Sequence, residues 1–330
     1  MGFCGNYPAM RKAVCASIIV ALAACAPVQP EADKAPPAGD DDPIATISKI
    51  AEGEIPESFD WEKTFPSWFA AVPPFRVAGP EMGGVYYVGT AGLGMYFIPT
   101  PDGHIVLDGG MPGQGKYVAD AIRTLGFDPA DIKILLNSHA HLDHSGGLAE
   151  LKQLSGAQMV ASEGDRSALE DGFYLGSEED SALNAPPVEV DRIIADGEQV
   201  GLGGITLTAR ITPGHTRGCT SWMMDLPHEG KSLQVLFFCS ATVAANRLVG
   251  PPQYAGIVAD YRRTFALTRD WQPDILLANH PEFFGLQAKR AAQTAGDSNA
   301  FVDQDAFPRL MAGLEKAFER ALAKQKGAEK

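Results

Sequence analysis

The fold class follows from the segment IKILLNSHAHLDHSGG, which spans residues 132–147. Its first part, Ile132–Asn137, is an apolar run of strand length, which predicts a strand buried on both faces. Three of the chain's seven histidines follow, and Ser145-Gly146-Gly147 then marks the start of a helix. The histidines are therefore predicted in a loop at the carboxyl end of a strand, where α/β proteins usually bind their ligands.

The spacing within this loop favours a dinuclear metal site. His139 and His141 are two residues apart, so in an extended chain their side chains point to the same side. Asp143 and His144 are adjacent and cannot both share that face. The natural arrangement is therefore two neighbouring metal ions rather than one.

Two further histidines follow other predicted strands. His215 comes after the strand 205–211 and lies beside a glycine, and His280 comes after the strand 275–278 and precedes a proline. With the loop they supply five imidazoles and one carboxylate, which are enough ligands for two Zn²⁺ ions with open positions for a shared hydroxide. The two remaining histidines are predicted to be surface residues: His104 and His228.

The rest of the chain alternates between strand-like and helix-like segments. Strands are predicted over residues 84–88, 95–99, 104–108, 132–137, 158–161, 199–202, 205–211, 220–224, 235–238 and 275–278. Helices are predicted over residues 117–125, 147–154, 254–271 and 308–324. This mixed α/β pattern indicates two sheets packed face to face with helices outside.

Composition excludes several function classes. The 330 residues are 45% hydrophobic and 21% charged, with 27 Lys and Arg against 41 Asp and Glu, which gives a formal charge of −14. A nucleic-acid partner is not expected, because this charge would repel a phosphate backbone. The mean hydropathy of −0.07, without an apolar run near the about 20 residues that a bilayer span requires, excludes a multi-pass membrane protein. We expect a monomer.

The amino terminus has the layout of an export signal. A short basic stretch at Met10-Arg11-Lys12 precedes the apolar residues 13–24, and the signal ends in Leu22-Ala23-Ala24-Cys25, which resembles a bacterial lipobox. An ordinary signal peptide cleaved after Ala23 is the alternative. We predict a signal peptide with lipobox over residues 1–25, a flexible linker and N-terminal extension over 26–70, and a folded domain over 71–330.

An exported protein with this signal would be periplasmic and attached to a membrane through the lipidated Cys25. Two cysteines then remain in the folded domain, Cys219 and Cys239, both in apolar strand-like surroundings. An even pair permits a disulfide in an oxidising compartment. We expect buried free thiols.

The order of these motifs resembles the metallo-β-lactamase superfamily. The resemblance rests on the His-x-His-x-Asp-His loop, on Gly214-His215-Thr216 and His280-Pro281, and on Val88-Gly89-Thr90 and Leu107-Asp108-Gly109-Gly110. It runs from about Pro74 to the last helix and implies an αββα sandwich with a dimetal site at one edge, between the two sheets. It assigns a first zinc to His139, His141 and His215 and a second zinc to Asp143, His144 and His280.

The residues after the strand 235–238 favour one subclass. Glyoxalase-two hydrolases, homoserine-lactone lactonases and persulfide dioxygenases generally have a metal-bridging aspartate there, whereas this chain reads Cys239-Ser240-Ala241-Thr242. Cys239 as a metal ligand is disfavoured by the intact His144. The pattern resembles class B β-lactamases of subclass three, in which Ser240 and Thr242 would hold the substrate carboxylate. The alternative is that both hydroxyls merely cap the strand end.

The implied function is a zinc-dependent β-lactam hydrolase, acting on cyclic amides and conferring antibiotic resistance. Two Zn²⁺ ions would supply a zinc-bound hydroxide that opens the ring, with Asp143 and His215 as catalytic residues. A small-molecule β-lactam is the expected partner. The alternatives are another dinuclear hydrolase of the superfamily, such as a lactonase, and a non-catalytic zinc-binding lipoprotein.

Three further features have two possible roles each. Asp108 is expected either to support the metal ligands from behind or to cap a turn. Arg217 either brings positive charge near the site or points outward. The loop 171–187, with Phe173 and Tyr174, either covers a bound substrate or is plain surface packing.

Overall fold

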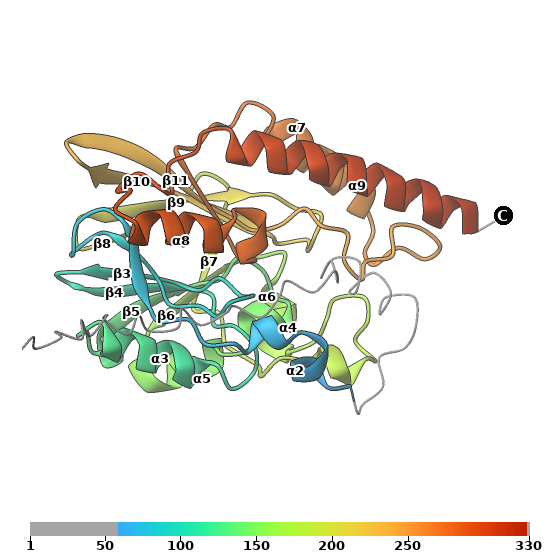
Figure 1. The fold of residues 1–330 in the computed structure, drawn as a ribbon. Helices are drawn as coiled ribbons and strands as arrows, with labels where there is room; N and C mark the ends of the chain where they lie inside the picture. The colour runs from blue at the N-terminus through green and yellow to red at the C-terminus, as the bar shows by residue number, and fades with distance from the viewer. Residues whose placement is uncertain (1–58, 329–330) are drawn as a thin grey trace, which may run out of the picture. The chain divides into compact units, whose positions relative to one another are not determined.

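Two β-sheets face each other, and helices cover their outer faces (Figure 1). The computed structural model describes residues 59–328. The predicted signal peptide, the lipobox at Cys25 and the linker lie outside the described residues.

The first sheet has the strand order β1-β2-β3-β4-β5-β6-β7. Its strands are β1 (Phe75–Ala78), β2 (Val85–Tyr87), β3 (Tyr96–Thr100), β4 (Gly103–Leu107), β5 (Ile132–Leu136), β6 (Gln158–Ser162) and β7 (Arg192–Ile194). Neighbours from β1 to β4 run antiparallel, and those from β4 to β7 run parallel. The carboxyl ends of β4, β5 and β6 therefore meet at one edge.

The second sheet has the order β12-β11-β10-β9-β8. Its strands are β8 (Gln199–Leu202), β9 (Ile205–Ile211), β10 (Thr220–His228), β11 (Lys231–Phe238) and β12 (Ile275–Ala278). Strands β11 and β12 are parallel, and β10 is antiparallel to both of its neighbours, β9 and β11. The carboxyl ends of β9, β11 and β12 therefore also share one edge.

Helices form the outer layers. They are α2 (Trp61–Thr64), α3 (Gly115–Thr124), α4 (Leu142–Ser145), α5 (Leu148–Ser155), α6 (Arg166–Asp171), α7 (Ile257–Leu267), α8 (Leu286–Thr294) and α9 (Ala306–Ala328). In Figure 1, α3 and α5 lie outside the first sheet, and α7 and α9 lie outside the second. Within residues 59–328, no helix combines the length and the apolar character that a membrane crossing requires.

The alternation of side chains along β4 explains the layering. Ile105 and Leu107 belong to the cluster between the two sheets, together with Trp222 of β10. Val106, which points the opposite way, packs with the helix layer around Val118 of α3. Because successive strand residues face opposite sides, one strand supplies both cores and both of its faces are buried.

The predicted elements largely match the observed ones. Strands β8, β9 and β12 have the predicted bounds, and the mixed α/β sandwich is confirmed. The sequence analysis missed β1 and β7 among the strands, and α2, α4, α6 and α8 among the helices, with α4 lying where a loop was predicted. Helix α7 begins at Ile257 rather than at 254, because Gly256 at its start adopts a left-handed conformation with φ of 93°.

The expectation that His104 is a surface residue is wrong. Its side chain alternates with that of Ile105 and faces the helix layer, where it is 7% exposed and contacts the rings of Phe97 and Phe127 edge to face. His104 Nδ1 has no hydrogen-bond partner in the described part of the chain. The other predicted surface histidine, His228, is half-buried, and its Nδ1 accepts a hydrogen bond from Gly79 N at 3.4 Å.

The expectation of free thiols is also wrong, because Cys219 and Cys239 form a disulfide. Cys219 directly precedes β10 and Cys239 directly follows β11. These strands are neighbours, and the two Cα atoms lie 5.9 Å apart, within the range of a disulfide. Local sequence patterns place each cysteine beside a strand but do not show that the two strands pair.

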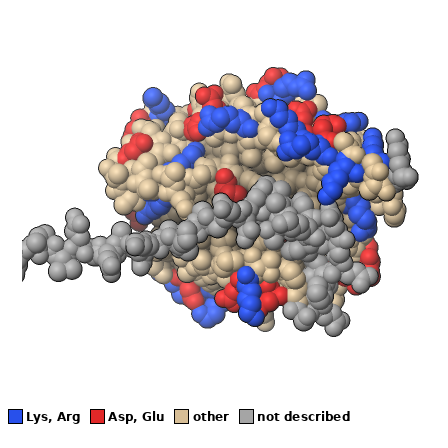
Figure 2. Space-filling view, turned by 45° about the vertical axis from the view of Figure 1, so that its right-hand side comes forward, with Lys and Arg blue, Asp and Glu red and all other residues tan. Residues whose placement is uncertain are grey.

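Acidic and basic side chains are intermixed on one face of the molecule. On the face that Figure 2 shows, Lys and Arg side chains lie among Asp and Glu side chains instead of forming one basic patch.

Candidate metal centre

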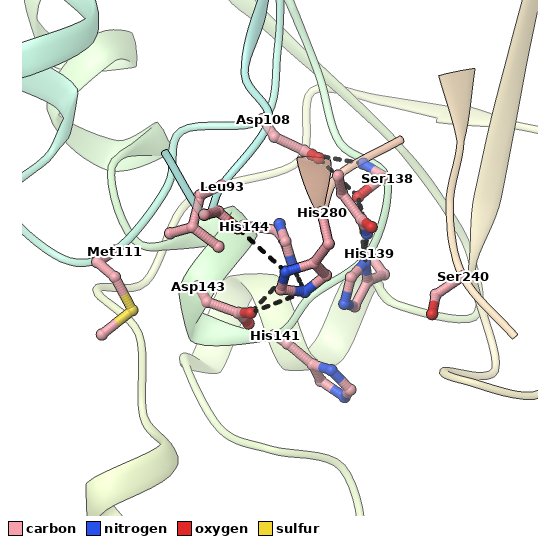
Figure 3. Close-up of polar contacts among 12 residues, drawn as sticks. Leu93, Asp108, Met111, Ser138, His139, His141, Asp143, His144, Ser240 and His280 are labelled. Carbon is pink, nitrogen blue, oxygen red and sulfur yellow. Dashed lines mark hydrogen bonds and ion pairs between the residues drawn. The ribbon is translucent and has the colours of Figure 1, made fainter. Parts of the chain in front are cut away.

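The shared edge of the two sheets gathers the predicted site residues. His139 follows β5, His215 follows β9, Ser240 follows β11 and His280 follows β12. Asp143 and His144 lie on the short helix α4, which continues the chain after His141. The structure therefore brings together, from four strand ends, the side chains that the sequence analysis selected. Figure 3 shows part of this set: His139, His141, Asp143, His144, Ser240 and His280.

The first group of candidate ligands contains three buried imidazoles. The candidate ligand atoms of His139, His141 and His215 all lie within 4.8 Å of one another. The Nε2 atoms of His139 and His215 are 3.1 Å apart. His215 Nδ1 lies 2.8 Å from the carbonyl oxygen of Thr242, which can only accept, so His215 carries its proton on Nδ1 and presents the Nε2 lone pair to the group.

The second group of candidate ligands contains one carboxylate and two imidazoles. Asp143 Oδ2 lies 3.0 Å from His144 Nε2 and 3.4 Å from His280 Nε2, and the two Nε2 atoms are 3.2 Å apart. His280 Nδ1 lies 3.2 Å from the carbonyl oxygen of Gly92, so its Nε2 also faces inward. Figure 3 shows Asp143 and His280 pointing toward each other. Because His139 also lies within 4.8 Å of Asp143 and His144, the two groups are adjacent.

Burial keeps the first group neutral. Desolvation, followed by the neighbouring imidazoles, holds the pKa of His139 and of His141 well below the usual range, and desolvation lowers that of His215 to about 4. Neutral imidazoles are the form that binds metals. Lone pairs that face one another at about 3 Å are satisfied by a cation between them, so the residues present fit a metal ion.

The second group combines an anionic carboxylate with two imidazoles. Burial alone would raise the pKa of Asp143, but the charge of His144 and the hydrogen bonds with both histidines outweigh burial and hold that pKa well below its usual range. Burial alone would lower the pKa of His280, but the hydrogen bond to Asp143 and the charge of Glu282 raise it. Asp143 is thus an anion at neutral pH, suited to a cation at this position.

Asp108 supports the loop from behind. Its backbone has a φ of 63°, and burial raises the pKa of its carboxyl group to about 6. The carboxyl group accepts hydrogen bonds from Ser138 N at 2.7 Å, from Ser138 Oγ at 2.6 Å and from Asn137 Nδ2 at 3.1 Å. Ser138 Oγ in turn lies 3.1 Å from His139 Nδ1. Of the two roles considered for Asp108, the contacts agree with orienting His139.

Asp165 is a supporting residue that the sequence analysis missed. It follows β6 and is 2% exposed. Its carboxyl group accepts hydrogen bonds from Ala140 N at 3.1 Å, Thr216 Oγ1 at 2.8 Å and Gly218 N at 2.8 Å. It therefore ties the loop of His139 and His141 to the loop of His215. Its position shortly after β6, on the same edge, is a sequence signal by which it could have been found.

The Ser240 and Thr242 hydroxyls lie beside the first group. Ser240 Oγ accepts a hydrogen bond from Thr242 N at 3.2 Å and lies 3.1 Å from Thr242 Oγ1. Thr242 Oγ1 also lies 3.2 Å from His215 Nδ1, and Ser240 is 1% exposed. In this arrangement the two hydroxyls cap the strand end.

Two neighbouring segments have clear positions. Arg217 is exposed, and its guanidinium carbon lies 5.1 Å above the Tyr254 ring, so it points outward. The end of the predicted N-terminal extension packs onto the body through buried Phe65 and Trp68. The Trp68 ring lies 5.8 Å from that of His280, a contact that the sequence analysis did not foresee.

Two facing sheets with clustered histidines and a carboxylate at their common edge define a metallohydrolase. The model of the metallo-β-lactamase superfamily matches residues 95–224, and the chain belongs to this superfamily. The fold and the histidine groups imply bound metal ions.

The similar solved structures include subclass B3 enzymes, as the resemblance predicted. BJP-1, a subclass B3 metallo-β-lactamase of Bradyrhizobium japonicum, is 47% identical with a TM-score of 0.77, and the match covers 80% of this chain and 98% of BJP-1. FEZ-1, a metallo-β-lactamase from Legionella gormanii, is 36% identical with a TM-score of 0.73, covering 78% and 98%.

Curated relatives of a different activity match a shorter region. The N-acyl homoserine lactonases AttM of Rhizobium johnstonii and Agrobacterium fabrum are 25% and 28% identical over 172 and 165 residues. These matches cover 40% of this chain and 59% of each lactonase. The similarity to the lactonases is thus partial, whereas that to BJP-1 extends over nearly all of that enzyme.

Proposed function

We propose that the protein is a zinc-dependent β-lactamase of subclass three. The observation that carries the proposal is the end of β11, where Ser240 stands instead of the bridging aspartate expected of lactonases, in a chain similar to BJP-1 over 98% of that enzyme. Lactone hydrolysis is the second candidate, because AttM lactonases match part of the chain.

Under this proposal His139, His141 and His215 hold one zinc ion, and Asp143, His144 and His280 hold the other. Zinc ions bound there would lower the pKa of water and polarise a carbonyl group. His215 keeps its proton on Nδ1 through Thr242, which leaves Nε2 free to bind. The buried surroundings strengthen each electrostatic contact with a polarised substrate.

The remaining steps use side chains of this chain. Asp143 Oδ2, ionised at neutral pH, would accept the proton of the oxygen that attacks the lactam carbonyl and pass it to the nitrogen released when the ring opens. Ser240 Oγ and Thr242 Oγ1 would exchange their mutual contact for the carboxylate of the substrate. Hydrogen bonds to a charged group are stronger than those between neutral groups, which favours this exchange.

The proposal includes export. We propose that the protein acts in the periplasm as a lipoprotein attached to the membrane through Cys25, that it is a monomer, and that resistance to β-lactam antibiotics is its physiological effect. Radiolabelled lipid incorporation that disappears in Cys25→Ser tests the attachment. Unchanged labelling in that variant would contradict it.

The test of the site compares wild type with His141→Ala and Asp143→Ala. Both variants should lose β-lactam hydrolysis while circular dichroism shows a retained fold. His228→Ala serves as the matched control, because His228 is a half-buried histidine that belongs to neither group. Full activity of either site variant in zinc-saturated buffer would overturn the assignment, and lactone cleavage without lactam turnover would favour the second candidate.

A further inference from the structure

Tyr174 makes the closest ring contact to the first group. It belongs to the loop of residues 172–187, here called the Tyr174 loop, and is 5% exposed. Its ring lies face to face with the His141 imidazole, with centroids 4.2 Å apart and an interplanar angle of 11°. A stack of this geometry restricts rotation of the imidazole about its side-chain bonds.

His141 differs from its two partners in how it is held. His139 Nδ1 lies 3.1 Å from Ser138 Oγ, and His215 Nδ1 lies 2.8 Å from Thr242 O. The His141 ring has no hydrogen bond to any residue between 59 and 328, and its other ring contacts are to the two partner imidazoles. Metal-binding histidines are normally oriented by a hydrogen bond on the second ring nitrogen. For His141, the stack against the Tyr174 ring replaces this hydrogen bond as the contact that orients the imidazole.

The same tyrosine is linked to His215. Tyr174 O–H donates to Asn246 Oδ1 at 3.0 Å. Asn246 Nδ2 donates to the main-chain carbonyl of His215 at 2.8 Å and lies 3.2 Å from Tyr261 Oη. The amide of Asn246 is thus held from both ends, and it connects Tyr174 with the main chain of His215.

Residues outside the two metal-binding groups also hold the Tyr174 loop. Gln253 Nε2 donates to Leu175 O at 2.8 Å and to Ser177 Oγ at 2.9 Å. The guanidinium of Arg247 donates to Ser177 Oγ at 3.3 Å and also to Gly176 O. These bonds fix the main chain on the carboxyl side of Tyr174, so the ring is presented to His141 by a braced segment.

We propose that Tyr174 is a positioning residue of the first metal site, which orients His141 through its ring and His215 through Asn246. The inference rests on the proposed function, because it takes these histidines as ligands. Coupling of this kind is reciprocal: if the ordered loop strengthens metal binding, metal binding stabilises the loop by the same factor. The loop expected to cover the substrate is then part of the metal site's support.

Two substitutions distinguish the effect of the Tyr174 ring from that of its hydroxyl group. Tyr174→Phe keeps the stack and removes the hydrogen bond to Asn246, and Tyr174→Leu removes the stack as well. Tyr86 provides the matched controls, because it is a buried tyrosine that packs on Phe97 and donates one hydrogen bond, to Glu81 O at 3.1 Å, away from the site. The controls are Tyr86→Phe and Tyr86→Leu.

The first measurement is zinc affinity of the full chain by competition with a chromophoric chelator. Loss of a residue that orients a metal ligand typically weakens binding about 10–100-fold, so Tyr174→Leu should weaken one of the two zinc equivalents by about that factor. Tyr174→Phe should weaken it by about 3–10-fold, as expected for one hydrogen bond. The Tyr86 variants should bind both equivalents as wild type does.

The second measurement is cleavage by a glutamate-specific protease at the exposed Glu178 and Glu179 of the Tyr174 loop. Chelation should accelerate cleavage of wild type, whereas in Tyr174→Leu the rate should be high with or without zinc. If wild type binds zinc and Tyr174→Leu binds both equivalents with unchanged affinity, the inference is overturned while the dimetal site stands. If wild type binds no zinc, the proposed function fails and the inference with it.

Discussion

Removing the Cys219–Cys239 disulfide should cost a calculable part of the stability. The bond closes a loop with a sequence separation of 20 residues between adjacent strands. The chain-entropy relation gives about 11 cal/mol/K for a loop of this length, or about 3 kcal/mol at room temperature. The double variant Cys219→Ala, Cys239→Ala should therefore lower the free energy of unfolding by about 3 kcal/mol. Both cysteines are buried, so the two lost sulfur atoms add a smaller packing cost.

Urea unfolding of wild type and of the double variant, each with and without a thiol reductant, measures this effect. Reductant should bring the wild-type transition down to that of the double variant and leave the double variant unchanged. Denatured wild type should also gain two free thiols on reduction. An unchanged thiol count would show that the two cysteines are not paired, and a double variant as stable as oxidised wild type would show that the disulfide does not stabilise the fold.

Three other substitutions test individual groups. Burial raises the pKa of Asp165 from 3.8 to about 6, so its stabilising contribution is complete below 3.8 and is lost as the pH rises through about 6. In urea titrations of metal-free protein, the free energy of unfolding of wild type should therefore rise by up to about 3 kcal/mol relative to that of Asp165→Asn between pH 7 and pH 4. Parallel pH profiles of the two proteins would argue against this. Ser240→Ala should raise KM for a β-lactam about 10-fold with little change in kcat, since it removes one hydrogen bond to a charged group, and an unchanged KM in steady-state kinetics would leave only the capping role. Burial lowers the pKa of His104, so wild type should lose stability relative to His104→Phe as the pH falls below 6.5. Thermal unfolding of both proteins from pH 7.5 to pH 5 measures this, and a constant difference between their unfolding temperatures would contradict it.

The sequence predicted the strand ends and the histidine groups because both depend on local patterns. The strand β5 is buried at every residue except Lys133, and the loop after it concentrates rare side chains within a few residues. His215 and His280 were found by the same rule, since each follows a strand of recognisable pattern. Parallel strands then bring their carboxyl ends together, which requires no knowledge of side-chain packing.

The features that the sequence analysis missed depend on contacts between distant segments. Asp165 bonds to Gly218, and Tyr174 to Asn246, across 53 and 72 residues respectively. Periodicity reports which face of an element is apolar, but it does not report which element lies opposite. The same limit applies to the disulfide, whose cysteines flank two strands that pair.

The two missed strands are short and irregular. In β1, Phe75–Ala78, the register with β2 shifts between Arg76 and Ala78, so the alternation of apolar and polar residues is broken. In β7, Arg192–Ile194, only the last residue is buried. Three residues at the edge of a sheet do not produce a recognisable period of two.

The central claim is that this edge of the two sheets holds two zinc ions that hydrolyse β-lactams. The most direct measurement follows the zinc content of the full chain and its turnover of a carbapenem and a cephalosporin in the same samples, during chelation and stepwise return of zinc. We expect two zinc ions per chain. Both activities should be lost when the metal is removed and should recover as zinc is returned. Lactam turnover that persists in metal-free protein, or a fully zinc-loaded protein that opens a homoserine lactone but neither lactam, would contradict it.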